Sequence, residues 1–175
     1  MKPLLVIREE EIFPNTEPYE VDDSWEDRVT VKMIVFDNDN NIALYGIRYL
    51  LLPGGGVEEG ETMEEAVKRE CLEEIGCKVE VIKEIGFTRE FRLKTKRKQE
   101  THCFVTKVIG DKGEPHSEQE DERKAKIEWM DINDALTLLK KNKEIISPLS
   151  YNSQFNVRGH IVFLEKYIEQ LKTPR

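Results

Sequence analysis

Four glutamates, an arginine and two glycines stand close together near the middle of this chain, and their types could bind a metal ion. Their spacing is G-x5-E-x7-R-E-x-x-E-E-x-G, and they are Gly55, Glu61, Arg69, Glu70, Glu73, Glu74 and Gly76. On a helix, Glu70, Glu73 and Glu74 would share an arc of about 100°, where each like-charge pair costs roughly a few tenths of a kcal/mol. A cation would offset that repulsion. Oxygen ligands without His or Cys suit Mg²⁺ or Mn²⁺.

The residues around these acids predict a helix over residues 63–75. Thr62 and Glu65 have the spacing of a capping box, which would start the helix, and Gly76 suits a left-handed stop. One face is apolar at every fourth position and can pack on a sheet: Met63, Val67, Cys71 and Ile75.

The sequence before this helix predicts where its acids lie. Leu50–Leu52 has the pattern of an apolar strand end, and the glycines of residues 53–56 allow the backbone to approach a ligand closely. The acids would then stand at a strand-to-helix crevice. The i,i+4 spacing favours a pair between Arg69 and Glu73. Glu61 could support a ligand through a water, which we favour, or pair with Arg69.

The same residues resemble the signature of the Nudix hydrolase family of MutT-like proteins, G-x5-E-x7-R-E-U-x-E-E-x-G-U, where U is apolar. All seven fixed positions match, Cys71 and Cys77 stand at the U positions, and the box covers Gly55 to Cys77. Residues 28–36 resemble the early core strand of the family, and residues 127–139 its late strand and helix. The resemblance implies an α/β chain of the α+β type with the Nudix fold, a mixed β-sheet sandwiched between α-helices.

Hydrophobic periodicity predicts the remaining helices and strands of a single domain over residues 1–175. Residues 1–27 would form a short strand and an acidic arm, and residues 155–172 a closing amphipathic helix. A basic hairpin tip is expected at residues 94–98, followed by a polar loop at residues 109–125. Further strands are expected at residues 42–47, 79–85, 87–92 and 101–108.

Composition excludes some function classes. A net charge of −8 over 175 residues argues against a general binder of nucleic acid polymers or anionic membranes. Three cysteines without paired spacing, Cys71, Cys77 and Cys103, favour a reducing compartment. With no segment suited to a signal peptide or a membrane span, we expect a cytoplasmic protein, either a monomer or a homodimer.

The family resemblance implies a reaction, the hydrolysis of a diphosphate bond in a nucleoside diphosphate linked to another group. It places Mg²⁺ (or Mn²⁺) on Glu70 and Glu74 with the Gly55 carbonyl, and Glu73 is a further candidate ligand. The cation would polarise phosphate oxygens and activate a water without a covalent intermediate. Arg69 would hold the carboxylates in position.

Two positions are candidates for the general base. Glu73 lies beside the metal ligands, but Arg69 would lower its pKa and weaken it as a base. Related enzymes often supply a base from a loop, and Glu120 is the preferred loop candidate. The same loop carries further acids: Glu118, Asp121 and Glu122.

The resemblance implies a nucleotide substrate, and one aromatic and basic group could bind it. Phe87, Arg89 and Phe91 alternate on one predicted strand, and Arg28 begins another; together they could stack a base and attract phosphates. An ordinary hairpin with core aromatics explains them equally well.

Within the family, a nucleoside triphosphate pyrophosphohydrolase is favoured, and oxidised nucleotides are one candidate substrate. Residues 78–101 lack the marker proline of many ADP-ribose pyrophosphatases and the marker tyrosine of many diadenosine polyphosphate hydrolases. ADP-ribose or nucleotide-sugar hydrolysis and dinucleoside polyphosphate hydrolysis remain alternatives. Alternatives of other classes are a non-catalytic ligand-binding module and an isomerase on the same fold.

Two other patterns are discounted. Residues 37–41 begin like a calcium loop, but Ile42 and Arg48 stand where that loop needs Gly and Glu, so a hairpin turn is expected. The three histidines, His102, His116 and His160, have no partner spacing and are expected to be structural.

Overall fold

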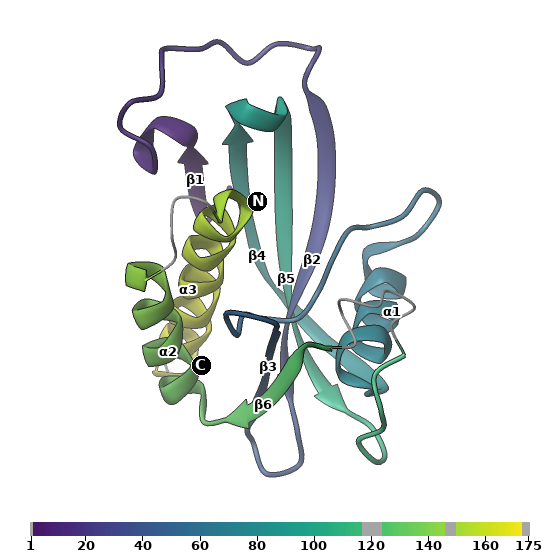
Figure 1. Cartoon of the computed structure of the whole chain (residues 1–175). Helices are drawn as coiled ribbons and strands as arrows, with labels where there is room; N and C mark the ends of the chain where they lie inside the picture. The colour runs from purple at the N-terminus through teal and green to yellow at the C-terminus, as the bar shows by residue number, and fades with distance from the viewer. Residues whose placement is uncertain (1, 117–123, 146–149, 173–175) are drawn as a thin grey trace.

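The computed structural model describes residues 2–116, 124–145 and 150–172. Within these ranges, six strands form one mixed sheet in the order β1-β4-β5-β2-β3-β6 (Figure 1). β1 pairs parallel with β4 and β2 parallel with β5, and the other neighbours are antiparallel. The strands are β1 (Leu5–Arg8), β2 (Glu26–Phe36), β3 (Ile42–Gly46), β4 (Val79–Arg92), β5 (Arg97–Val108) and β6 (Lys126–Met130).

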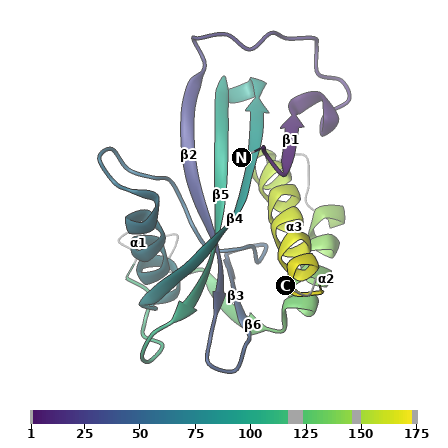
Figure 2. The ribbon, with the colours of Figure 1, turned by 180° about the vertical axis from the view of Figure 1, so that it is seen from behind.

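Helices cover both faces of the sheet, as the family resemblance implied. α1 (Met63–Ile75) lies on one face, and α2 (Ile132–Ile145) and α3 (Tyr151–Lys172) lie on the other (Figures 1 and 2). Alternation along β2 makes two cores, because Val31 and Met33 pack toward α1 while Ile34 packs toward α2 and α3. This arrangement confirms the predicted mixed sheet sandwiched between helices. Within the described ranges, no helix is long and apolar enough to cross a membrane.

The glycine loop lies along β2 without forming the strand predicted at Leu50–Leu52. Leu51 makes an isolated bridge with Tyr45. Beyond it, the loop bonds to β2 at alternate residues: Val31 N–H donates to the Gly55 carbonyl (2.9 Å) and Met33 N–H to the Pro53 carbonyl (3.0 Å). Proline has no N–H to donate, so regular pairing cannot continue through residue 53. The loop therefore borders β2 and leads directly into α1.

Several predicted boundaries shift. The strands predicted at residues 79–85 and 87–92 are one strand, β4, whose pairing with β5 shifts register twice between Val81 and Gly86. The basic tip contains a 3-10 turn, η2 (Leu93–Thr95), and β5 begins at Arg97, four residues earlier than predicted. α3 also begins four residues early, at Tyr151. The N-terminal arm holds a second 3-10 turn, η1 (Glu9–Glu11).

The discounted patterns are structural. The Asp37 carboxylate accepts hydrogen bonds from the N–H groups of Asp39 and Asn41 (2.9 and 2.8 Å), which closes the β2–β3 hairpin. The calcium-loop alternative is therefore unnecessary. His160 is buried, and its Nδ1 accepts from Leu52 N–H (3.1 Å). His102 stacks on Phe87 in the sheet.

A buried polar group fixes the start of α3 on the sheet. Arg92, on β4, donates to Glu90 Oε2 through Nε (2.8 Å), to Asn152 Oδ1 through Nη1 (2.9 Å) and to Asn156 Oδ1 through Nη2 (2.9 Å). Its guanidinium also lies 4.9 Å from the ring centroid of Phe155. Since Glu90 and Arg92 are almost fully buried, this pair connects β4 to α3 out of reach of solvent.

Candidate active site

α1 begins and ends where its local signals predict. Glu65 N–H donates to the Thr62 hydroxyl (3.2 Å), and Thr62 N–H donates to the Glu65 carboxylate (2.8 Å), so the capping box is complete. Gly76 ends the helix in the left-handed region, with φ of 65°. Because Val67 and Cys71 are buried against the sheet, the neighbouring rows of acids face the glycine loop.

The glycine loop lies directly against two of these acids. Glu70 is 8% exposed. A side chain at position 55 would collide with this carboxylate, which would have to move out of the crevice. Glu74 Oε2 accepts a hydrogen bond from Gly54 N–H (2.6 Å). Gly55, Glu70 and Glu74 therefore come together in the crevice between loop and helix.

Arg69 lies at the centre of the remaining acids. Its Nε and Nη2 donate to the two carboxylate oxygens of Glu61 (2.9 and 3.0 Å), and Nη1 donates to Glu70 (2.9 Å) and Glu73 (3.1 Å). Nη2 also donates to the Gly56 carbonyl (2.8 Å). The expected Arg69–Glu73 pair is present. Glu61 pairs with Arg69, the less favoured of its two predicted roles, and both of its carboxylate oxygens accept from the guanidinium.

The cluster carries more acid than base. Arg69 bonds to three glutamates, a fourth, Glu74, accepts from Gly54 N–H, and Lys32 Nζ donates to the Gly54 carbonyl nearby. Burial raises the pKa of Glu70, although Arg69 and Lys32 act against this shift. The hydrogen bond from Arg69 lowers the pKa of Glu61. An excess of negative charge beside a close-fitting loop is suited to a divalent cation.

The donor set fits Mg²⁺ or Mn²⁺ in its chemistry. The Glu70 and Glu74 carboxylates and the Gly55 carbonyl are all oxygen donors, and the carbonyl keeps a second lone pair beside its bond from Val31. In the described part of the chain, no three acidic, His or Cys side chains converge as a ready metal cage. Arg69 stands among the acids, and Glu73, with its side chain 39% exposed, is paired with it.

A cleft adjoins Glu74 and leads from the acids toward α3. It has a volume of about 390 Å³, within the range of small-molecule sites. Its lining brings together charged, aromatic and hydroxyl side chains from distant segments, including Lys32, Arg48, Tyr49, Ser150 and Ser153. Sequence reasoning missed these residues. The one local signal is Lys32, a charge within an apolar strand.

The predicted substrate group lies elsewhere. Arg28, Arg89 and Phe91 line a hollow of about 410 Å³ that shares no lining residue with the cleft at Glu74. Phe87 is not in this hollow. It is 8% exposed and stacks on His102, with ring centroids 5.1 Å apart. The geometry thus favours the interpretation of Phe87 as an ordinary core aromatic.

The two arginines of the predicted substrate group, Arg89 and Arg28, have different surroundings. Arg89 Nε donates to Glu100 on β5 (2.9 Å), so its charge is partly neutralised. Arg28 differs, because its guanidinium lies beside Gly56 of the glycine loop. Of this group, Arg28 is the member that the structure brings to the acid-rich segment.

The loop candidate for the general base, Glu120, lies outside the described residues, as do Glu118, Asp121 and Glu122. The residues just before this loop segment contact the C-terminal end of α1. His116 N–H donates to the Glu73 carbonyl (3.0 Å), and Gly113 N–H donates to the Gly76 carbonyl (3.0 Å). The segment that precedes the loop acids is therefore attached to the end of the acidic helix.

Comparison with known proteins agrees with this fold. The family model for the NUDIX domain matches residues 26–150. The chain therefore belongs to the NUDIX domain family, the family of the Nudix hydrolases.

Individual relatives add detail. The chain is 50% identical over 46 residues to the nucleoside triphosphatase NudI of Enterobacter sp. (strain 638), a match that covers 25% of this chain and 33% of that protein. The match thus spans only a third of the relative's length.

Solved structures share the fold over most of the chain. The MutT protein of Methanosarcina mazei Go1 has a TM-score of 0.55 and 17% identity, covering 87% of this chain and 100% of that one. A NUDIX hydrolase from Nitrosomonas europaea has a TM-score of 0.58 and 18% identity, covering 85% of this chain and 93% of that one. At these identities the likeness concerns the fold.

Proposed function

We propose that the protein is a nucleoside triphosphate pyrophosphohydrolase that depends on Mg²⁺ or Mn²⁺. The observation that carries the proposal is the crevice in which Glu70 and Glu74 meet the Gly54–Gly55 loop, with the Lys32 cleft directly beside it. The acids are suited to a cation, and the cleft is suited to the rest of an anionic nucleotide.

Glu70, Glu74 and the Gly55 carbonyl would hold the cation. When bound, the cation polarises a phosphate oxygen and lowers the pKa of an attacking water. Arg69 would act as a positioning residue, since it fixes Glu70 and Glu73 while its other bonds attach it to Glu61 and the loop.

Lys32 and Arg48 would attract the phosphates of the substrate, because both line the cleft on the side of Glu74. Tyr49 offers an aromatic surface in the same cleft. The similarity to NudI, a nucleoside triphosphatase, supports a triphosphate over a nucleotide sugar.

The general base is Glu73 or Glu120 in this proposal. Glu73 is partly exposed and receives one hydrogen bond from Arg69, which leaves it room to accept a proton from water. In the Glu73→Gln and Glu120→Gln variants, the base is the position where kcat falls by roughly 10²–10⁴ while Mg²⁺ affinity stays near wild type.

The setting that we propose is the cytoplasm. The three cysteines are free and buried, which is compatible with a reducing compartment. The partner is a small nucleotide, and the choice between monomer and homodimer stays a prediction for sedimentation analysis.

A product assay tests the reaction. The protein is incubated with Mg²⁺ and with nucleoside triphosphates, 8-oxo-dGTP, ADP-ribose, a nucleotide sugar, diadenosine tetraphosphate and isopentenyl diphosphate, and the products are identified by mass. We expect pyrophosphate and a nucleoside monophosphate from triphosphates. If only ADP-ribose, the nucleotide sugar or diadenosine tetraphosphate were hydrolysed, that compound would replace nucleoside triphosphates as the assigned substrate. Isomerisation, or binding without turnover, would contradict the hydrolase proposal.

A further inference from the structure

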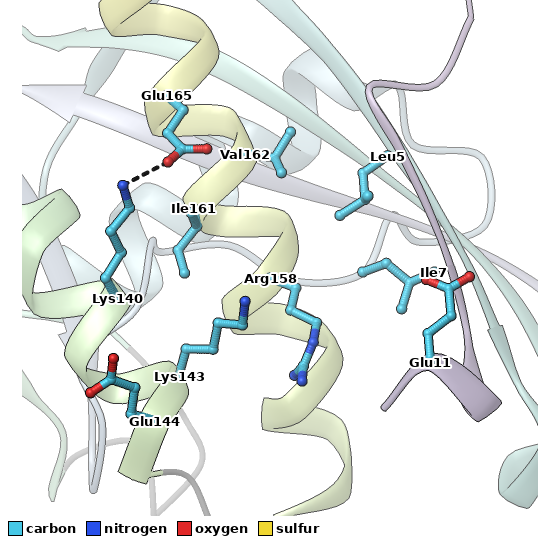
Figure 3. A pocket seen from close by; sticks show the side chains of 10 residues that line it. All are labelled: Leu5, Ile7, Glu11, Lys140, Lys143, Glu144, Arg158, Ile161, Val162 and Glu165. Atoms are coloured by element: carbon cyan, nitrogen blue, oxygen red, sulfur yellow. Dashed lines mark ion pairs between the residues drawn. The ribbon is translucent and has the colours of Figure 1, made fainter. Parts of the chain in front are cut away.

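A second cavity, of about 720 Å³, opens between β1, α2 and α3 (Figure 3). It shares no lining residue with the cleft at Glu74. Apolar side chains from β1 and α3 form part of its wall: Leu5, Ile7, Ile161 and Val162. Its volume is within the range of small-molecule sites. None of the roles proposed for the hydrolytic reaction uses this cavity.

Within the part of the chain that the structure describes, Lys143 and Arg158 of this cavity have no acidic partner. Lys140 forms an ion pair with Glu165 (2.7 Å), so its charge is neutralised within the wall. Arg158 donates through Nη1 only to the Gln154 carbonyl (2.6 Å) and side chain (3.0 Å), which are neutral. Among the described residues, neither Arg158 nor Lys143 forms an ion pair.

The same two cations share one part of the cavity. In Figure 3, Lys143 extends from α2 and Arg158 from α3 into the space between the helices and β1. Two acids, Glu11 and Glu144, line other parts of the same cavity. Burial lowers the pKa of Arg158, as expected for a guanidinium that loses water without gaining a carboxylate. Two converging cations repel each other, and a bound anion would offset that repulsion.

We propose that this cavity binds a small amphiphilic phosphate, a phosphomonoester head between Lys143 and Arg158 and an apolar body on the wall of Leu5 and Ile161. A phosphomonoester carries nearly two negative charges at neutral pH and therefore matches two cations better than a carboxylate does. Nε and Nη2 of Arg158 make no hydrogen bond with a described residue and can bind the head.

Titration calorimetry with octyl phosphate tests the head group. We expect saturable binding, weaker binding of octanoate, and little binding of octanol or inorganic phosphate. Lys143→Gln and Arg158→Gln should each weaken octyl phosphate binding by about tenfold to a hundredfold, the usual effect of losing a charged hydrogen bond. Lys141→Gln is the matched control, because Lys141 is an exposed neighbour on α2 outside the cavity lining. It should bind like wild type.

A series of butyl, hexyl and octyl phosphate tests the apolar wall without any mutation. Affinity should rise with each methylene, by at most about fourfold for full burial. Thermal unfolding of each variant establishes that it is folded. The proposal is overturned if octyl phosphate does not bind wild type, if octanoate or octanol binds as tightly, if chain length has no effect, or if folded Lys143→Gln and Arg158→Gln bind like Lys141→Gln.

Discussion

Arg69 and Arg92 each organise a cluster of hydrogen bonds, but the two clusters differ in charge and in burial. Arg69 donates to three glutamates and a carbonyl, and its side chain is 24% exposed. Arg92 donates to one glutamate and two neutral asparagines, and its side chain is 3% exposed. One cluster therefore has excess acid near solvent, and the other is balanced and buried.

This difference separates a site from a structural connection. A balanced buried pair satisfies its own charges and holds α3 on β4, so it needs no ligand. Acids in excess of their bases repel one another and remain poised for a cation, which is a feature of functional sites. Counting charges against partners thus distinguishes two arginine clusters that look alike as lists of hydrogen bonds.

The largest expected effect is loss of hydrolysis when the acid-rich cluster loses a ligand. In Glu70→Gln or Glu74→Gln, we expect kcat/KM to fall at least about 10³-fold, as when a main source of transition-state stabilisation is lost. Stability should not fall, since like-charge repulsion decreases. Glu64→Gln is the control on the same helix, because Glu64 pairs only with exposed Lys68. Wild-type turnover in both ligand variants would contradict the site.

The next effect concerns the balanced cluster. Arg92→Ala leaves Glu90 buried without a counter-charge, so the free energy of unfolding should fall by about 3–5 kcal/mol. Arg97→Ala removes a more exposed pair with Glu26 and should cost below about 1 kcal/mol. Urea unfolding measures both. Equal losses of unfolding free energy in the two variants would show that burial does not distinguish the two pairs. Hydrolysis per folded molecule should be unchanged in either variant.

Sequence predicts the acid-rich cluster well because its signals are local. The capping box, the Gly76 stop and the i,i+4 pair of Arg69 and Glu73 all lie within one helix. The bond between Arg69 and Glu61 was less certain, since it depends on how the loop before the helix turns back.

Contacts between distant segments could not be predicted in the same way. The cleft at Glu74 combines Lys32 with Ser150, more than a hundred residues apart, and no local pattern encodes that meeting. Phe87 has its core role because the register of β4 and β5 places it opposite His102. The Arg92 cluster likewise requires the position of α3.

A smaller effect should follow from replacing Arg69 itself. Arg69→Ala should lower kcat by about 10- to 100-fold, because Glu70 and Glu73 lose the group that orients them. Alanine favours the helix, but Glu61 and Glu70 lose their counter-charge, so we expect a loss of stability that is smaller than in Arg92→Ala because this cluster lies nearer to solvent. Arg69→Lys keeps the charge but cannot bind both oxygens of Glu61 through a planar fork, and its kcat should lie between the two. Wild-type kinetics in Arg69→Ala would show that this arginine forms an ion pair without positioning the carboxylates.

The smallest effect is a difference in how stability depends on pH. The Arg69 hydrogen bond lowers the pKa of Glu61 below 4.5, whereas burial raises the pKa of Glu90 above 4.5 despite Arg92. Glu61 therefore adds stability above pH 4.5, and that contribution is lost as the pH falls through its lowered pKa. Glu90 behaves in the opposite way, because the folded state holds its proton more tightly, so its contribution declines as the pH rises from 4.5 to its raised pKa.

Two amide variants separate these contributions. Urea unfolding of wild type, Glu61→Gln and Glu90→Gln is measured from about pH 3 to pH 7, the interval around the ordinary carboxyl pKa. Relative to Glu61→Gln, wild type should lose its advantage on acidification. Relative to Glu90→Gln, wild type should lose stability as the pH rises. Slopes of the same sign would mean that the two arginines act alike on their carboxylates. The contrast between a partly exposed acid-rich cluster and a buried balanced one would then lack its electrostatic basis.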